Sequence, residues 1–358
     1  MISLKHLALT LTLLGQVCHA AQGSKTTNPT ARDMTFTFER PDPLTAKVVG
    51  TAWKIYLSGV IQKDTPRKFE EFLQVNDVPV WSFVFLNSPG GDLFGGMELG
   101  RVFRKHSLFT YIGLQADKNE PRREQSGVCY SACAYAFLGG TFRFWTVGSH
   151  YGVHRFYSAG SSGDMDRAQI ISALIANYVR EMGIDGDLFS ISTIAGPDDI
   201  YEPPLSLLKQ LSVVNDGFGK TVWSVESNEG ALYLKGERDT VYGINKFMVG
   251  CSNNSPIVTI IIDPQGRQKE RALWEAQSLV IDAKPEPIKP RFYEIMPNGT
   301  WLWAMYTLSG EQISRLLQAC SVGMIYQMSY DAPVFHGFME MPFDGAAGKL
   351  VGILNHCK

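Results

Sequence analysis

The stretch GVCYSACAYAFLGG, residues 127–140, decides how the rest of the chain is interpreted. Ser131 stands midway between Cys129 and Cys133, at the start of a run of small and apolar residues. Helical spacing would place both sulfurs on the same side of one turn. The motif is therefore a redox pair, half of a metal site, or a clamp around a nucleophilic serine. The sequence on either side has to distinguish these three interpretations.

The chain begins with the features of an export signal. Lys5 precedes an uncharged apolar stretch over residues 7–17, and small residues follow at Ala20–Ala21. This stretch is too short to span a bilayer, so we predict a signal peptide over residues 1–20, with an uncleaved membrane anchor as the alternative. No other stretch is apolar for long enough to cross a bilayer. We expect a periplasmic or secreted protein without a membrane span in its mature form.

Length, charge and cysteine content narrow the class further. A chain of 358 residues exceeds what one hydrophobic core usually organises, which predicts two domains. The formal net charge is −2, and the basic residues are scattered, so nothing indicates a nucleic acid partner. Of the six cysteines, Cys18 lies in the predicted signal peptide. In an oxidising compartment most of the other five should be paired, with one left over.

The first domain is predicted over residues 46–217, after a flexible polar lead-in over residues 21–45. Apolar strand patterns alternate with helical patterns, the strands at 53–61, 80–88, 108–113 and 150–156, and the helices at 67–75, 97–105 and 164–182. In the last helix an apolar stripe is expected at Ile170, Leu174, Tyr178 and Met182, with Gly183 as the stop. This alternation predicts an α/β domain with a mainly parallel sheet.

A smaller α+β domain of unassigned role is predicted over residues 218–358. Short alternating strand patterns appear there, with hairpin turn signals at 263–266 and 297–299. Two helical patterns, EQISRLLQA and DGAAGKLVGIL, interrupt the strands.

Three features of the first domain point to chemistry when they are taken together. In LNSPGGD, residues 86–92, a strand runs into Gly90-Gly91, whose backbone N–H groups can hold an anion, although a plain tight turn would look the same. A helix after Ser131 would aim the Ala132 N–H at whatever the serine attacks, although a serine there can simply be a cap. His154 follows in a strand, where an isolated histidine is often a core residue.

In this order on an α/β frame, the three features resemble the family of the Clp protease proteolytic subunit, within the Clp protease/crotonase fold. The resemblance covers residues 53–216 and implies a spiral of β-β-α units. Four segments carry it, namely Asn87-Ser88-Pro89-Gly90-Gly91, Tyr130-Ser131-Ala132, Val153-His154 and Pro197-Asp198-Asp199-Ile200-Tyr201. By family order Asp199 fits the third member of a catalytic triad, and Asp198 is the alternative.

The resemblance implies acyl transfer without a metal or other cofactor. Ser131 would attack a carbonyl, His154 would take the hydroxyl proton, and Asp199 would orient the imidazole. The oxyanion hole would be formed by backbone N–H groups, those of Gly90 or Gly91 and of Ala132. The polar insertion 114–127 is expected to be a mobile lid beside this site.

The function that follows is that of an exported serine hydrolase, a peptidase that works without ATP on a peptide or protein substrate. An export signal would separate this chain from the cytosolic unfoldase that feeds the Clp subunit. Two alternatives remain open at this point. One is an esterase with the same triad, and the other is a non-catalytic periplasmic binding protein on a Clp-like frame. A homo-oligomer is also left open.

The cysteines flanking Ser131 depart from the Clp pattern, although exported bacterial proteins carry a similar Cys-x-Ser-x-Cys motif. No third cysteine or histidine lies at zinc-finger spacing, and a thioredoxin-type site needs two intervening residues. We therefore favour a disulfide between Cys129 and Cys133 that stiffens the turn at Ser131. A reducible switch and two free thiols are the alternatives. Cys251 should pair with Cys320 or Cys357, and the sequence does not choose between them.

Overall fold

The computed structural model describes residues 33–44, 46, 51–116, 125–156, 165–196, 198–264, 266–268, 274–295 and 301–357. The predicted signal peptide, most of the predicted lid and the turn signal at 297–299 lie outside these residues. The buried apolar side chains form two separate clusters, one within residues 53–214 and the other within residues 234–353. The boundary near residue 218 stays a prediction, and the parts before and after it are described separately.

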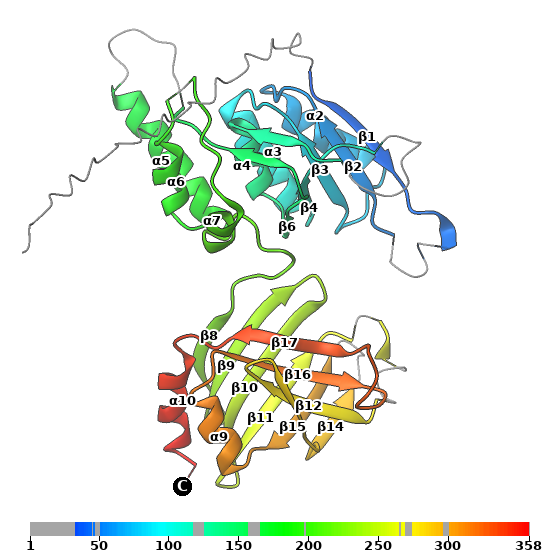
Figure 1. The fold of residues 1–358 in the computed structure, drawn as a ribbon, viewed down its shortest axis with the longest axis vertical. Helices are drawn as coiled ribbons and strands as arrows, with labels where there is room; N and C mark the ends of the chain where they lie inside the picture. Colours follow the sequence, from blue (N-terminus) through cyan, green and yellow to red (C-terminus); the bar gives the residue numbers. More distant parts are fainter. Residues whose placement is uncertain are drawn as a thin grey trace, which may run out of the picture. The chain divides into compact units, whose positions relative to one another are not determined.

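The N-terminal part is a mixed α/β structure built on a five-stranded sheet of order β1-β2-β3-β4-β6 (Figure 1). Its strands are β1 (Thr35–Glu39), β2 (Lys54–Ser58), β3 (Phe83–Asn87), β4 (Phe109–Ile112) and β6 (Arg143–Phe144). All neighbours are parallel except β1 and β2. A second, two-stranded parallel sheet pairs β5 (Val128–Tyr130) with β7 (His150–Gly152). The sheet core is fully buried at Ile55, Leu57, Val84 and Leu86, as expected of parallel strands covered on both faces.

Six helices accompany these sheets in the described residues, namely α2 (Thr65–Val75), α3 (Leu93–Lys105), α4 (Ala132–Leu138), α5 (Met165–Glu181), α6 (Asp187–Ser192) and α7 (Leu205–Gln210). Glycines let α3 approach α4 closely. A Cβ on Gly96 would lie 2.2 Å from the Ala132 carbonyl oxygen, and one on Gly139 would lie 2.0 Å from that of Gly100. Every residue of α4 is buried, so the helix that follows Ser131 is held firmly in place. No helix within the described ranges is long and apolar enough to span a bilayer.

Two details differ from the sequence-based expectations. Residues 35–39 of the predicted flexible lead-in 21–45 form strand β1, because Phe36 packs on Phe69 and Phe72. In α5 the first half of the expected stripe is shifted by one residue, while Tyr178 and Met182 are buried as expected. Ile170 and Leu174 are exposed, and Ile171 and Ile175 are buried in their place. Consecutive apolar residues in this helix offer two stripes, and contact with the rest of the core decides between them.

The C-terminal part is mostly antiparallel β structure, with two helices in its described residues (Figure 1). One sheet has the order β14-β15-β11-β10-β9-β8 and the other has the order β13-β12-β16-β17. The strands are β8 (Val222–Asn228), β9 (Ala231–Thr240), β10 (Gly243–Ser252), β11 (Ser255–Ile262), β12 (Ala276–Ile281), β13 (Lys284–Pro287), β14 (Phe292–Ile295), β15 (Leu302–Thr307), β16 (Ser321–Gln327) and β17 (His336–Pro342).

The two helices, α9 (Gly310–Leu316) and α10 (Ala346–Leu354), match the two predicted helical patterns. Strands β12 and β16 do not fit the short alternating patterns expected for this part. Strands β12 and β16 are buried almost throughout their length, and their apolar runs lack the alternation that marks a half-exposed strand.

Candidate active site

Ser131 occupies a strained turn between β5 and α4. Its backbone has φ 57° and ψ −122°, a conformation that favours glycine because a Cβ is crowded there. The turn is fixed by its surroundings, since the Ser131 N–H donates to the Gly152 carbonyl at 3.0 Å. Such a conformation costs on the order of 1–3 kcal/mol and persists only where neighbouring structure imposes it. A sharp strand-to-helix turn of this kind presents a serine hydroxyl to a substrate.

His154 lies two residues beyond β7, and its side chain contacts Ser131 directly. The distance between His154 Nε2 and Ser131 Oγ is 2.7 Å. Both side chains are partly exposed, so a substrate can reach them. A neutral imidazole whose Nε2 carries no proton accepts the hydroxyl proton across this contact. The pair therefore has the geometry of a nucleophile and its general base.

The structure does not bring Asp199 into this contact. His154 Nδ1 is buried and has no hydrogen-bond partner among the described residues. Asp198 and Asp199 are both exposed, and the Asp199 N–H donates to the Gly196 carbonyl at 3.2 Å within a turn. The described residues thus assemble a serine–histidine pair, and the predicted third member stands apart from it.

The glycine loop packs against Ser131. Gly90 and Gly91 have φ values of 107° and 139°, and a Cβ on Gly90 would lie 2.7 Å from Ser131 Cβ. The Gly90 N–H donates to Ser88 Oγ at 3.1 Å. The N–H groups of Gly91 and Ala132 have no acceptor among the described residues. Of the two glycines, Gly91 therefore has the N–H group that remains available to an oxyanion.

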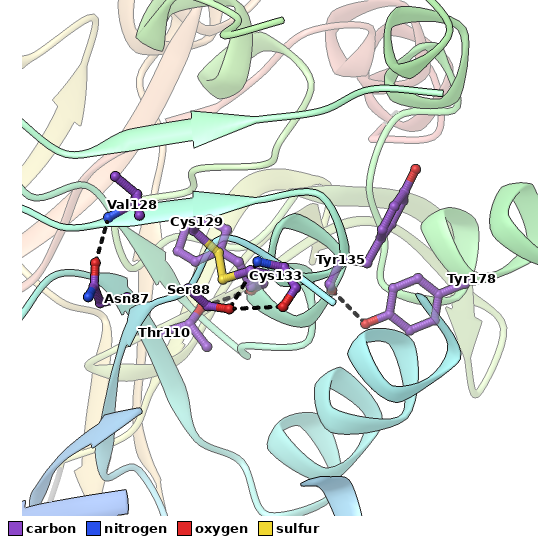
Figure 2. Close-up of a disulfide and its surroundings, with 10 residues drawn as sticks. Asn87, Ser88, Thr110, Val128, Cys129, Cys133, Tyr135 and Tyr178 are labelled. Carbon is purple, nitrogen blue, oxygen red and sulfur yellow. Dashed lines mark hydrogen bonds between the residues drawn. A yellow bond between two sulfur atoms is a disulfide. The ribbon is translucent and has the colours of Figure 1, made fainter. Parts of the chain in front are cut away.

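Cys129 and Cys133 form a disulfide with a Cα–Cα distance of 5.1 Å (Figure 2). Cys129 belongs to β5 and Cys133 is the second residue of α4. The bond therefore joins strand to helix around Ser131, and the expectation that both sulfurs lie on one helical turn is wrong. Both cysteines are fully buried. Asn87 adds a further tie in Figure 2, where its Oδ1 accepts from the Val128 N–H at 3.1 Å.

In the C-terminal part Cys251 pairs with Cys357, and Cys320 is an exposed free thiol. This pairing resolves the choice that the sequence left open, and it excludes Cys320 from the disulfide candidates. Within the described ranges no group of three or more His, Cys, Asp or Glu side chains is arranged to hold a metal ion.

A hydrogen-bonded group next to the serine was missed by the sequence analysis. Glu202 accepts from the Tyr130 hydroxyl at 2.6 Å and contacts His150 Nδ1 at 2.8 Å. Tyr130 directly precedes Ser131. The only sequence signal for this group was that Glu202 lies three residues after Asp199, in the segment that closes the family resemblance.

No protein-family model matches the chain, and no curated protein matches it. Among solved structures, the chain is similar to a point mutant of ClpP1 from Listeria monocytogenes at a TM-score of 0.33 and 18% identity, covering 45% of this chain and 88% of that one. It is also similar to a point mutant of a membrane-bound stomatin-specific protease, 1510-N, at a TM-score of 0.32 and 15% identity, covering 44% and 75%. Both likenesses are weak and cover less than half of the chain.

Removal of the first disulfide should mainly lower the reaction rate, and removal of the second should mainly lower the free energy of unfolding. The Cys129–Cys133 bond closes a very short loop, so replacing both residues with alanine should lower the free energy of unfolding by no more than about 2 kcal/mol. It should still lower the rate at which Ser131 reacts roughly a hundredfold, because a shift of about 1 Å at Ser131 is that costly. Alanine is used because a serine would place two hydroxyl groups in a fully buried site.

The matched control is the double change of Cys251 and Cys357 to alanine. That bond closes a loop with a sequence separation of 106, so its loss should cost on the order of 4 kcal/mol of stability without changing the rate per folded molecule. Calorimetry and active-site-normalised rates measure both quantities. Equal rate losses in the two double variants would show that the bond beside Ser131 has no special role.

Proposed function

We propose that the protein is an exported serine hydrolase, a peptidase that needs no ATP, on a frame of the Clp protease/crotonase type. The observation that carries this proposal is the 2.7 Å contact between Ser131 Oγ and His154 Nε2 at a strained strand-to-helix turn. Strained non-glycine residues cluster at active sites, and here the strained residue is the serine that contacts a histidine.

The chemistry follows from this geometry. His154 Nε2 takes the proton from Ser131 Oγ as the oxygen attacks the carbonyl carbon of the substrate. The carbonyl oxygen becomes an oxyanion, which the free N–H groups of Gly91 and Ala132 would stabilise. The imidazolium then protonates the leaving amine, and the acyl group remains on Ser131. A water molecule, deprotonated by His154, releases the acid and restores the serine.

A panel of peptide and ester substrates tests the proposed class. A peptidase should cleave unstructured peptides by amide hydrolysis without added nucleotide, and ATP should not change the rate. Hydrolysis of esters alone would favour an esterase with the same residues. Failure to react with either substrate class or with a fluorophosphonate would favour a binding protein and would contradict the proposal.

Asp199 is proposed as the group that orients His154 during turnover, because Nδ1 is buried and lacks a partner in the described residues. Asp199→Asn should then lower kcat by at least about a hundredfold, since removing the triad carboxylate in serine proteases costs on the order of 10⁴. The neighbouring variant Asp198→Asn is the matched control and should change kcat by less than about threefold. Steady-state kinetics of both variants decide the assignment, and wild-type turnover in Asp199→Asn would leave a Ser–His dyad.

A further inference from the structure

The segment Tyr201–Glu202 contacts both strands that lead to the proposed catalytic pair. Tyr201 and Val153 exchange two backbone hydrogen bonds, each with an N–O distance of 2.9 Å. Val153 is the residue before His154. The backbone of this segment therefore fixes the strand end that carries the His154 Cα atom.

The side chain of Glu202 provides the second connection. One carboxylate oxygen accepts from the Tyr130 hydroxyl at 2.6 Å, and the other lies 2.8 Å from His150 Nδ1. The parallel register of β5 and β7 pairs Val128 with His150 and Tyr130 with Gly152. Because side chains two residues apart share a face of a sheet, Tyr130 and His150 point to the same side, where one carboxylate reaches both.

The Tyr130 ring has little freedom to move away. A Cβ on Gly152 would lie 2.6 Å from Tyr130 Cδ1 and 2.3 Å from Ile200 Cγ2, so only glycine leaves room for the ring at this position. Burial, together with the hydrogen bond to Glu202, raises the pKa of the Tyr130 phenol, which stays a proton donor. Burial also raises the pKa of Glu202, but the hydrogen bonds from Tyr130 and His150 lower it by more, so the group is a carboxylate.

From this arrangement we infer that Glu202 is a positioning residue, which acts through Tyr130 to hold Ser131 Oγ against His154 Nε2. The inference rests on the proposed function. Glu202 directly follows Tyr201, whose backbone pairs with Val153, the residue before His154. Its carboxylate accepts from Tyr130, the residue before Ser131. The Glu202 and His150 side chains are 44% and 52% exposed, so their contact contributes little to global stability. Its effect is on local geometry.

The test compares Tyr130→Phe, Glu202→Ala and the double variant with the wild-type protein. Tyr130→Phe keeps the ring over Gly152 and removes only the hydroxyl. Each single variant should lower kcat and the rate of acylation by a fluorophosphonate about 10-fold, with KM unchanged, because only the alignment of the nucleophile is lost. The double variant should be no slower than the slower single variant, since both remove the same hydrogen bond. Melting temperatures should stay within about 2 °C.

Glu181→Ala is the matched control, since Glu181 is also a half-exposed carboxylate with a partner, Arg101 at 2.7 Å. It should leave kcat unchanged. The inference is overturned if Tyr130→Phe acylates at the wild-type rate, if the two single effects multiply, or if the rate loss only follows a loss of folded protein.

A second readout separates this inference from the proposed function. The Ser131 amide, which donates to Gly152, should exchange its hydrogen about 10-fold faster in Tyr130→Phe than in the wild-type protein, whether or not the protein is an enzyme. If the wild-type protein does not react with the fluorophosphonate, the proposed function fails, and amide exchange alone decides whether Glu202 holds the turn. Unchanged exchange would overturn the inference.

Discussion

Ser131→Ala should lower the rate of peptide hydrolysis by about 10⁴-fold or more and abolish reaction with a fluorophosphonate. In the proposed mechanism the serine oxygen forms the covalent bond, and loss of a serine nucleophile in a triad enzyme removes nearly all of the acceleration that the triad provides. The fold should be retained, because alanine differs from serine only by the hydroxyl that contacts His154. Active-site titration and steady-state kinetics measure the loss.

Two companion variants make this result specific. Ser172→Ala removes a hydroxyl in α5 that donates to the Ala168 carbonyl and should leave the rate unchanged. Ser131→Gly should also be inactive but should raise the free energy of unfolding by about 1 kcal/mol, because glycine accepts the φ of 57° without strain. Residual hydrolysis above a few per cent in Ser131→Ala would move the chemistry to another residue.

Arg143→Met should destabilise the N-terminal part by roughly 3 kcal/mol or more. The Arg143 guanidinium donates to the carbonyls of Val213, Ser212 and Gly140, with distances from 2.6 to 2.9 Å. Arg143 is 4% exposed, and burial, aided by the charge of Arg104, lowers its pKa to about 9. Methionine fills a similar volume but leaves the carbonyls of Val213 and Ser212 without the Arg143 donor, while Gly140 still accepts from Arg104 at 3.2 Å. Each unsatisfied carbonyl costs about 1–3 kcal/mol.

This change also tests how the helix after Ser131 is supported. Gly140 lies just beyond the end of α4, so Arg143 holds the C-terminal end of the helix whose N-terminal end follows Ser131. Scanning calorimetry should show a melting temperature lower by about 10 °C. The control Arg180→Met removes an exposed arginine that bonds only Asn177 among the described residues and should melt within about 2 °C of the wild-type protein. The same small shift in Arg143→Met would mean that the carbonyls find other donors.

The local signals in the sequence predicted the nucleophile region well. The strand before Asn87, the glycine turn, and the helix after Ser131 are all decided by neighbouring residues, through apolar runs, glycine and small helix formers. The contact of His154 with Ser131 joins residues separated by 23 positions and was expected only from the family resemblance. The Cys129–Cys133 bond was favoured from the cysteine spacing and the predicted export, although its position across a strand and a helix was not expected.

Features that depend on distant packing could not be predicted. Glu202 reaches Tyr130 only because the segment after Asp199 pairs with Val153, and no pattern in the sequence marks that pairing. The lack of a partner for His154 Nδ1 among the described residues likewise depends on packing between distant segments. In the C-terminal part, the partner of Cys251 was a choice between two cysteines that only the arrangement of β10 and the end of α10 resolves.

The most direct test of the account is to locate the covalent adduct on the wild-type protein. The purified protein is treated with a fluorophosphonate, its intact mass is measured, and the modified peptide is sequenced by mass spectrometry. The account predicts one adduct per chain, on Ser131. An adduct on any other residue, or none on protein shown by calorimetry to be folded, would contradict it.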